Sequence, residues 1–247
     1  GTELPEIGVF TVMEDGVGAL QPKIAVIVPS LNEERHIEGT LRSILSQDTP
    51  VEVVVVDGGS TDRSPEIART LARVISGTRG RASQMNEGAR HTSGDVLVFL
   101  HADTRMPPGY CRMLLEVRET EGVVGGFSPM DFDSSSPLLN FYARLTRTPV
   151  WFFHYGDQAF FVRREIFEEM GGFAEMPIME DLDFLNRLRK KGRLALLPVP
   201  GITSARRFLE GGVLRTQMKN VLLVLLFVLG VNPTLLKRFY PDTRGKR

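Results

Sequence analysis

The sequence predicts an α/β fold in which a mostly parallel central sheet is flanked by helices. The valine-rich run 51–56 is typical of a buried strand, and it leads directly into the turn 57–62, Asp-Gly-Gly-Ser-Thr-Asp. A second apolar run at 95–100 ends in the sequence 101–103, His-Ala-Asp. Ligands bind at the carboxyl ends of the strands in an open α/β sheet. These two acidic strand ends therefore predict where a ligand binds.

Strand and helix signals alternate through the first half of the chain, which indicates parallel strands joined by helices. The helix expected at 33–47, for example, places Ile37, Leu41 and Ile44 on one face. Strands are expected at 24–28, 51–56 and 95–100, and helices at 33–47, 64–74, 81–90 and 107–121.

The second half of the chain is less regular, and no internal repeat or interdomain linker interrupts it. Strands are expected at 123–128, 158–163, 193–197 and 202–207, and helices at 137–147, 179–191 and 211–229. We expect three segments: a flexible N-terminal segment (1–22), one domain (23–208) and a C-terminal helical extension (209–247).

Composition limits the classes of function. The 247 residues carry 30 Lys and Arg against 30 Asp and Glu, without a long basic run, so nucleic-acid binding is not expected. The single cysteine, Cys111, excludes an internal disulfide and disfavours a thiolate zinc site. Residues 1–20 lack the basic start and apolar stretch of a secretory signal. These features predict a cytoplasmic protein.

The run 221–231 contains eleven apolar residues without a charge. A helix that spans a bilayer needs about 20 such residues, so this run is not expected to cross one. Arg215, Lys219, Lys237 and Arg238 flank it. Two interpretations remain open: packing in the core or in a homodimer interface, and an interfacial helix at the inner face of the membrane.

Polar residues 29–34, Pro-Ser-Leu-Asn-Glu-Glu, follow the first strand. One interpretation is a helix cap formed by Asn32, with the glutamates favoured by the helix dipole. The other is that exposed backbone groups and Glu33 hold a nucleoside.

The turn 57–62 also has two interpretations. Its glycines allow a ligand to approach the backbone closely, and Asp57 could accept a hydrogen bond from a base or ribose. Alternatively, the segment is only a tight turn in which Asp62 caps the next helix.

Two further clusters carry carboxylates. Asp103, at the end of a strand and close to His101, suits Mg²⁺ or Mn²⁺ bridging a diphosphate, although a plain surface turn is the alternative. Glu180 and Asp181 lie at the start of a predicted helix, where acidic residues often only complement the helix dipole.

Taken together and in this order, the clusters resemble the family 2 glycosyltransferases, which are inverting enzymes with the GT-A fold. Residues 28–34 are similar to the family's opening motif, and 56–62 to its nucleoside turn, with Gly58 where a second Asp is common. Residues 80–88 resemble the segment before the metal motif. His101 replaces the first Asp of the Asp-x-Asp motif, and Glu180-Asp181 is similar to the acceptor-side pair.

The resemblance covers roughly residues 23–208 and is strongest to short soluble bacterial members. The Gln-x-x-Arg-Trp motif and the membrane helices of the processive synthases are absent from the sequence. The resemblance therefore implies transfer of a single sugar, with inversion, from a nucleoside-diphosphate sugar to an acceptor hydroxyl. A UDP-sugar is the favoured donor, and the acceptor is a lipid or a small molecule.

The resemblance also implies roles for individual residues. The half 23–105 would bind the nucleotide and the half 106–208 the acceptor. Asp181, with Glu180 beside it, would be the catalytic base, and Asp103 with His101 would bind the divalent cation, Mn²⁺ or Mg²⁺. The nucleotide-binding candidates are Pro29, Ser30, Asn32, Glu33, Asp57, Gly58, Ser60, Arg81, Gln84, Ala102 and Asp103.

Two groups of candidates are less specific. Arg206 and Arg207, at the end of the strand expected at 202–207, are diphosphate candidates, with a solvated basic pair as the alternative. The acceptor candidates could equally belong to the core or to an interface. They are Trp151, Tyr155, Asp157 and Gln158.

Other functions remain as alternatives. His101 would fit a degenerate nucleotide-binding or partner subunit without transferase activity. A sugar-phosphate nucleotidyltransferase would need a glycine-rich, basic loop after the first strand, where this chain has residues 30–33, Ser-Leu-Asn-Glu. The enzyme hypothesis requires Asp57, Asp103 and Asp181 to converge on one pocket.

Overall fold

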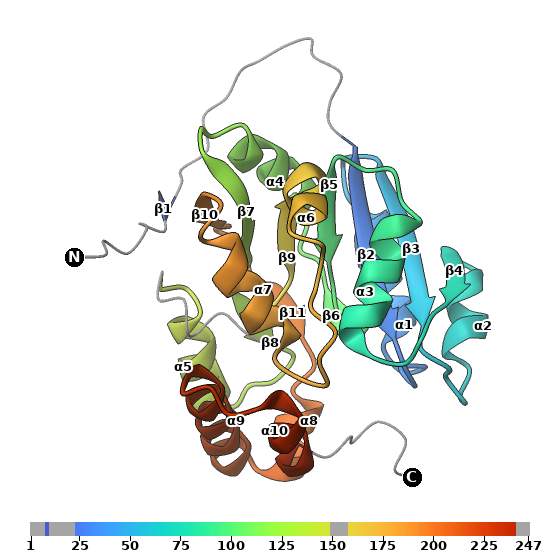
Figure 1. Ribbon diagram of the computed structural model, residues 1–247. Helices are drawn as coiled ribbons and strands as arrows, with labels where there is room; N and C mark the ends of the chain where they lie inside the picture. The colour runs from blue at the N-terminus through green and yellow to red at the C-terminus, as the bar shows by residue number, and fades with distance from the viewer. Residues whose placement is uncertain (1–7, 10–22, 149–157, 241–247) are drawn as a thin grey trace.

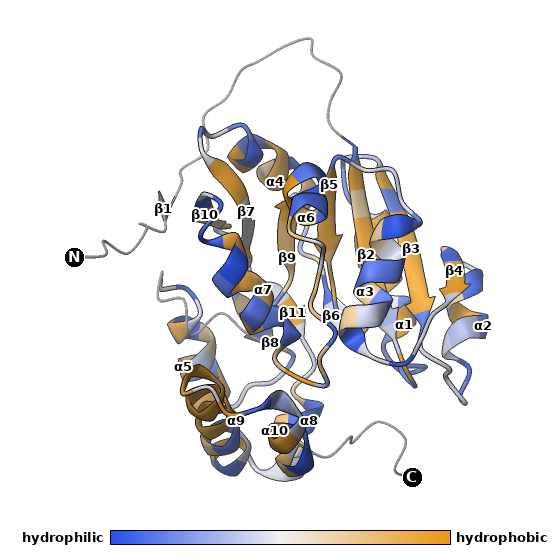
Figure 2. Ribbon diagram, in the orientation of Figure 1, coloured by the Kyte–Doolittle hydropathy of each residue, from blue (hydrophilic) through white to orange (hydrophobic). Residues whose placement is uncertain are grey.

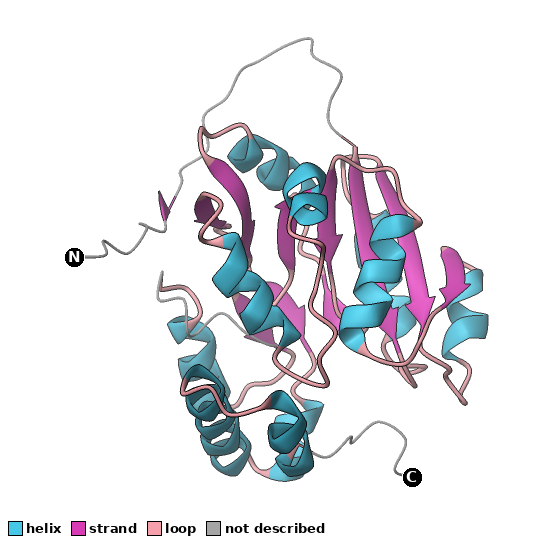
Figure 3. Ribbon diagram, viewed as in Figure 1, coloured by secondary structure: helices cyan, strands magenta, loops and turns pink. Residues whose placement is uncertain are grey.

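The centre of the molecule is a mixed, mostly parallel sheet with helices on both faces, as Figures 1 and 3 show. The computed structural model describes residues 8–9, 23–148 and 158–240. The fold class predicted from the sequence is confirmed. In spatial order the main sheet comprises β1 (Gly8–Val9), β10 (Arg193–Leu196), β7 (Val123–Phe127), β9 (Phe160–Arg163), β5 (Val96–Phe99), β2 (Ile24–Ser30), β3 (Val51–Asp57) and β4 (Arg73–Ser76).

Strand β9 is antiparallel to both of its neighbours, and the other pairs of the main sheet are parallel. A second, three-stranded sheet has the order β6 (Thr104–Arg105), β11 (Gly201–Thr203) and β8 (Met130–Phe132). Helices in the described residues are α1 (Ile37–Leu45), α2 (Ser64–Arg69), α3 (Arg81–Arg90), α4 (Tyr110–Arg118), α5 (Pro137–Leu145), α6 (Arg164–Glu169), α7 (Glu180–Leu188), α8 (Arg206–Gly211), α9 (Val213–Val228) and α10 (Pro233–Phe239).

The alternation of side chains along the strands divides the core into two layers. On β2, Val26 and Val28 pack with residues of α1, α2 and α4, whereas Ala25 and Ile27 pack with residues of α3, α6 and α7. Both faces of the sheet are therefore covered, which explains why β5 and residues 24–28 of β2 are apolar. Figure 2 shows the strands of the main sheet largely in the orange of hydrophobic residues.

The register of β2, β3 and β5 brings their carboxyl ends to one edge of the sheet. Ser30 pairs with Asp57 across β2 and β3, and Ile27 pairs with Phe99 across β2 and β5. The loops after these three strands therefore leave from neighbouring positions. Helices α5, α8, α9 and α10 lie beyond this edge, below the strand ends in Figure 1.

Two of the expected elements are wrong in part. The helix expected at 64–74 ends at Arg69, because Val74 and Ile75 belong to the edge strand β4, which pairs with β3. β-Branched side chains favour this extended conformation. The strand expected at 202–207 ends at Thr203, and Arg206 begins α8.

The C-terminal extension is helical as expected, but it is not one helix. Gly212 adopts a φ of 78° and separates α8 from α9. A second break precedes α10, where the side chain of Asn232 accepts a hydrogen bond from the backbone N of Thr234 at 2.9 Å. None of the helices in the described ranges combines the length and the apolar character needed to cross a membrane.

The N-terminal segment was expected to be flexible. Its described part, Gly8–Val9, forms a short strand that pairs with Ala195 and Leu196 of β10. The rest of residues 1–22 lies outside the described residues. The strand could not be predicted because two residues carry no periodicity.

Candidate active site

The loops that follow β2 and β3 are joined by hydrogen bonds at their tips. Asn32 adopts a φ of 54°, and its side-chain oxygen accepts a hydrogen bond from the backbone N of Thr61 at 2.8 Å. Its own backbone N donates to the hydroxyl of Ser60 at 2.9 Å. The expected cap is wrong, since the residue before α1 is His36 and no side chain caps that helix. Asn32 instead fixes one loop against the other.

Asp57 organises the turn after β3. Its carboxylate accepts hydrogen bonds from the backbone N of Gly59 and of Ser60, both at 3.1 Å, and from the Ser60 hydroxyl at 2.5 Å. Asp62 accepts from the backbone N of Ser64 at 2.9 Å and of Glu34 at 3.1 Å. The turn is therefore preformed, with the half-buried Asp57 carboxylate at its centre.

Gln84 lies directly beneath this turn. It is almost fully buried, and its amide group donates to the carbonyl oxygens of Ser30 at 2.9 Å and Val56 at 2.7 Å. A Cβ on Gly58 would lie 3.0 Å from the Gln84 amide. The structure thus gives Gln84 a supporting role beneath the strand ends and explains why a small residue occupies position 58. Contacts of Gln84 and Gly58 with a nucleotide stay predictions.

Ser30 offers a polar group at the end of β2. It is 2% exposed, and its hydroxyl has no hydrogen-bond partner among the described residues. Buried hydroxyl groups are normally paired. Ser30 therefore marks a position where a ligand's donor or acceptor would satisfy the protein. Pro29 precedes it on the same buried strand.

Arg206 connects α8 to the loop after β2. Its guanidinium lies 3.4 Å from the carboxylate of Glu33, whose side chain is 1% exposed. The guanidinium also acts on His36: burial and Arg206 lower the pKa of His36, while Asp103 and Asp133 raise it. Arg206, His36 and Asp103 are therefore electrostatic neighbours. His36 was missed in the sequence, because it falls inside the helix expected at 33–47 and forms no distinctive pattern with its neighbours.

The loop after β5 is held on two sides. The Ala102 carbonyl oxygen accepts a hydrogen bond from the Thr40 hydroxyl of α1 at 2.9 Å, and the Asp103 carbonyl oxygen accepts one from the backbone N of Ser204 at 3.2 Å. The Asp103 side chain is half-buried, and His101 is 9% exposed. The loop therefore places one carboxylate at the strand edge, as predicted.

The donor set around Asp103 fits a cation that a substrate helps to hold. Within the described ranges, no three His, Cys, Asp or Glu side chains gather as a metal cluster. Mg²⁺ sites commonly use one or two carboxylates and take their other ligands from water and substrate phosphates. Asp103 is suited to such a shared site and not to a site formed by protein ligands alone.

Helix α7 begins beside α3, far from it in sequence. Met179 adopts a φ of 68° and is followed by the buried Glu180, whose Oε1 lies 2.7 Å from Nε of Arg81. Burial raises the pKa of Glu180 despite the attraction of Arg81, and the charge of Asp181 raises it further. Arg81 therefore contacts Glu180 of the predicted acceptor-side pair directly, which was not foreseen.

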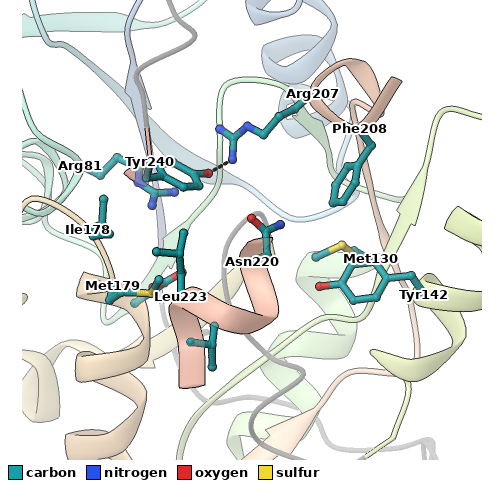
Figure 4. Close-up of a pocket in the computed structure, with 12 residues that line it drawn as sticks. Arg81, Met130, Tyr142, Ile178, Met179, Arg207, Phe208, Asn220, Leu223 and Tyr240 are labelled. Carbon is teal, nitrogen blue, oxygen red and sulfur yellow. Dashed lines mark hydrogen bonds between the residues drawn. The ribbon is translucent and has the colours of Figure 1, made fainter. Parts of the chain in front are cut away.

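Asp181 lines a pocket of about 60 Å³ at the start of α7. One of its carboxylate oxygens accepts a hydrogen bond from the backbone N of Leu182 at 2.8 Å. Figure 4 shows the pocket, with Arg81 and Tyr240 on one side and Met130 and Tyr142 on the other. The remaining lining residues are Ile178, Met179, Arg207, Phe208, Asn220, Leu223 and Val224.

The three predicted carboxylates occupy different positions around this region. Asp181 faces the pocket and is half-buried, whereas Asp57 and Asp103 do not line that pocket. Arg81 connects the Asp181 pocket to the Asp57 turn. It contacts Glu180 beside Asp181, and it begins α3, the helix that carries Gln84 beneath the turn. Convergence of all three carboxylates on one ligand stays a prediction.

Arg207 is not part of a solvated basic pair. Its guanidinium donates a hydrogen bond to the Tyr240 hydroxyl, and its Cζ lies 5.2 Å from the centre of the Tyr240 ring. The ammonium groups of Lys219 and Lys237 each lie 6.0 Å from the same ring centre. Three cations therefore surround Tyr240 at the edge of the Asp181 pocket. This cluster was not predicted from the sequence, because its members are up to 33 residues apart.

Of the four acceptor candidates, Trp151, Tyr155 and Asp157 lie outside the described residues. Gln158 is 5% exposed and directly precedes Ala159, whose carbonyl oxygen accepts a hydrogen bond from Ser128 at 2.9 Å. Its contact with an acceptor stays a prediction.

Comparison with known proteins identifies the family. Residues 25–173 match the model of glycosyl transferase family 2. The chain belongs to glycosyl transferase family 2. The match includes the loops after β2, β3 and β5 but ends before Glu180, so the acceptor-side pair lies outside it.

Solved structures of glycosyltransferases share the GT-A fold of this chain. The glucosyl-3-phosphoglycerate synthase of Mycobacterium tuberculosis, in complex with Mn²⁺, UDP and phosphoglyceric acid, has a TM-score of 0.62 and 23% identity. That similarity covers 98% of this chain and 89% of the other. The mannosyltransferase of Pyrobaculum calidifontis, in complex with GDP-Man and Mn²⁺, has a TM-score of 0.56 and 27% identity, covering 74% of this chain and 56% of the other.

Curated relatives are longer than this chain. The β-monoglucosyldiacylglycerol synthase of Synechocystis is 27% identical over 241 residues, which cover 78% of this chain and 48% of that protein. The chain spans from 26% to 47% of the length of three further relatives.

Proposed function

We propose that this family 2 member is a metal-assisted, inverting glycosyltransferase. It transfers a single sugar from a nucleoside-diphosphate sugar to an acceptor hydroxyl. The observation that carries the proposal is the direct ion pair between Arg81 and Glu180, beside Asp181 in a partly apolar pocket. This pair joins Glu180, the residue before the candidate base Asp181, to α3, the helix that supports the Asp57 turn.

The nucleotide would lie on the loops after β2 and β3. The preformed Asp57 turn, the unpaired Ser30 hydroxyl and the Glu33 carboxylate supply donors and acceptors at one sheet edge. A preformed turn costs little conformational entropy on binding. UDP is the favoured nucleotide. Among the solved structures of similar fold, one holds UDP and another GDP-Man, so both belong in a binding test.

Asp103 would hold the divalent cation, with His101 as the second candidate. The cation supplies positive charge where the departing diphosphate develops negative charge. The Arg206 guanidinium, close to Glu33 and His36, adds fixed positive charge in the same neighbourhood. Arg206 is therefore the better diphosphate candidate of the two arginines, and Arg207 contacts Tyr240 instead.

Asp181 would act as the general base. The acceptor oxygen forms a bond to the anomeric carbon while the bond to the diphosphate oxygen breaks, and the acceptor proton passes to the Asp181 carboxylate. Attack on the face opposite the leaving group inverts the configuration. Glu180 cannot easily take this role, since it is 2% exposed and its carboxylate contacts Arg81.

The lining of the pocket bears on the acceptor. Most of the side chains around Asp181 are apolar or aromatic, including Met130, Phe208 and Leu223. An acceptor with an apolar part beside its hydroxyl fits this lining. A lipid acceptor, met at the inner face of the membrane by a cytoplasmic protein, is the version that we favour. One relative carries the name of a glycolipid synthase, which supports this choice.

The proposed base is tested by Asp181→Asn. The variant should bind UDP as the wild type does and lose about 10²–10⁴-fold in transfer or donor hydrolysis. Asp183→Asn is the matched control, because it removes one carboxylate from the same helix while Asp183 pairs with Arg187 at 2.8 Å. Turnover by Asp181→Asn close to that of the control would show that Asp181 is not the base.

His101 stands where the metal motif has another carboxylate. A degenerate nucleotide-binding subunit without transferase activity is therefore the second candidate function. The two functions differ in one measurement. A transferase hydrolyses its sugar nucleotide slowly without an acceptor, whereas a binding subunit shows a nucleotide-dependent thermal shift and no hydrolysis with any donor.

A further inference from the structure

Helix α9 exposes apolar side chains where a surface helix normally carries polar ones. Ten of the thirteen large apolar side chains that are exposed in the described part of the chain lie within residues 209–239. On α9 they include Leu214, Met218, Val221 and Leu225, which are 44–65% exposed. Their spacing of three and four residues places them on one stripe. In Figure 2 α9 is predominantly hydrophobic.

The other face of α9 is already packed. Leu223 and Val224 are buried, and Leu223 belongs to a small core with Ile178 and Leu236. The exposed stripe is therefore additional to the face that holds α9 on the protein. A partner outside the described residues is needed to remove it from water.

The charges around the stripe define that partner. Residues 211–240 contain no Asp or Glu but four cations, although the whole chain has zero formal net charge. Arg215 and Arg238 are exposed, and Lys219 and Lys237 lie beside Tyr240. Glu210 of α8 is the one acidic side chain that lines the adjoining groove, where Arg207, Arg215 and Lys219 also lie. An apolar stripe with this excess of cations complements the surface of an anionic bilayer.

A second copy of the chain fits this surface poorly. A two-fold dimer places the same patch of one protomer against that of the other. The four cations of each patch would then meet the four of its partner, with only Glu210 of α8 beside them to offset the charge. Like charges brought together in this way disfavour the dimer.

The stripe is also connected to the candidate active site. A groove of about 670 Å³ runs between α8, α9 and α10, and Arg215 and Leu222 lie along it. It shares Arg207, Leu223 and Tyr240 with the pocket that Asp181 lines. Helices α8 and α9 thus line the Asp181 pocket, and α9 also carries the exposed stripe.

We propose that α8, α9 and α10 dock on an anionic lipid bilayer, which places the mouth of the Asp181 pocket at the membrane surface, where a lipid acceptor reaches it. The docking stands on the exposed stripe and its cations alone. The delivery of an acceptor rests, in addition, on the proposed transferase function.

The docking is tested with sedimented vesicles of phosphatidylcholine alone and of phosphatidylcholine with phosphatidylglycerol. The full chain should bind the anionic vesicles, and high salt should weaken the binding. Each basic residue near such a surface contributes about fivefold to the partition coefficient. The double variant Arg215→Glu with Arg238→Glu should therefore bind at least about 25-fold more weakly.

The apolar contribution is tested by the triple variant Leu214→Ser, Met218→Ser and Leu225→Ser. All three side chains are more than half exposed, so their replacement should preserve the fold. Leu45→Ser, on α1 and 48% exposed, and Arg69→Glu, exposed at the end of α2, are matched controls that should bind vesicles as the wild type does.

Three outcomes would overturn the docking. These are equal binding to neutral and anionic vesicles, unchanged binding by the triple variant, and a dimer that the triple variant dissociates while no vesicle binding is seen. Titration of UDP and GDP without vesicles tests the proposed function separately. Vesicle binding without nucleotide binding would remove the transferase and leave the docking intact. Nucleotide-sugar hydrolysis without vesicle binding would remove the docking and leave the transferase intact.

Discussion

Nε of Arg81 lies 2.7 Å from Oε1 of Glu180, and this contact joins the first turn of α3 to the first turn of α7. The Glu180 side chain is 3% exposed and that of Arg81 is 22% exposed. A carboxylate so far from water needs a counter-charge, and Arg81 supplies it. The pair therefore fixes Asp181 relative to α3, the helix that carries Gln84 beneath the proposed nucleotide turn.

Removing the arginine should cost stability. Arg81→Met keeps most of the side chain's length and leaves the buried Glu180 carboxylate without its partner. Breaking a buried ion pair in this way typically costs about 3–5 kcal/mol, and the partial exposure of Arg81 places the expected loss at roughly 2–3 kcal/mol. Urea unfolding at pH 7 measures it. Arg42→Met, which breaks an exposed pair with Glu38, is the control and should change the unfolding free energy by less than about 1 kcal/mol.

The buried carboxyl also predicts a pH dependence. Burial raises the pKa of Glu180 above its ordinary value of 4.5, so the folded state holds this proton more tightly than the unfolded state. Stability from this group is then fully present below pH 4.5 and declines as the pH rises through the folded-state pKa. Glu180→Gln lacks this titration. The unfolding free energy of the wild type minus that of Glu180→Gln should therefore fall with rising pH. A difference that rises with pH instead would show that the attraction of Arg81 outweighs burial in setting the pKa of Glu180.

The contact between position 58 and Gln84 gives a separate prediction. A Cβ at Gly58 would lie 3.0 Å from the Gln84 amide, which already donates to Ser30 and Val56. Gly58→Ala should therefore displace Gln84 and cost about 1–2 kcal/mol. In a Gln84→Ala background the same change should cost less, because the crowded atoms are gone. Chemical denaturation of the four proteins measures this coupling, and equal costs in both backgrounds would contradict it.

The elements predicted best from the sequence are those with a long apolar pattern. β2, β3 and α3 lie close to their expected positions, because each has a face that must be buried. β4 was absorbed into a predicted helix, because its edge position leaves Arg73 and Ser76 exposed and weakens the signal. Short elements were missed because their stability comes from partners: β6 exists through its pairing with β11, almost 100 residues later.

The parts of the candidate site that lie at strand ends were also predictable from the sequence. Strand ends bring Ser30, Asp57 and Asp103 to one edge, and a sequence pattern can locate strand ends. Contacts between distant segments leave no such pattern. The pairing of Arg206 with Glu33 and of Arg207 with Tyr240 became visible only in three dimensions. Arg206 was expected at the end of a strand, but it lies in the first turn of a helix that turns it toward Glu33.

The presence of His101 where the metal motif has an Asp predicts a measurable effect on metal dependence. Asp103 would hold the cation together with the diphosphate, while His101 occupies the position of a second carboxylate. Asp103→Asn should reduce the Mn²⁺-dependent gain in UDP affinity by at least about tenfold, because even indirect disturbance of a metal ligand typically costs that much. His101→Asp, which adds a hard oxygen ligand, should increase the gain. Calorimetric titration of UDP with and without Mn²⁺ measures both effects. Asp131→Asn removes an exposed carboxylate that pairs with Arg147 and should leave the gain unchanged. A Mn²⁺-dependent gain that survives in Asp103→Asn would place the cation on other residues.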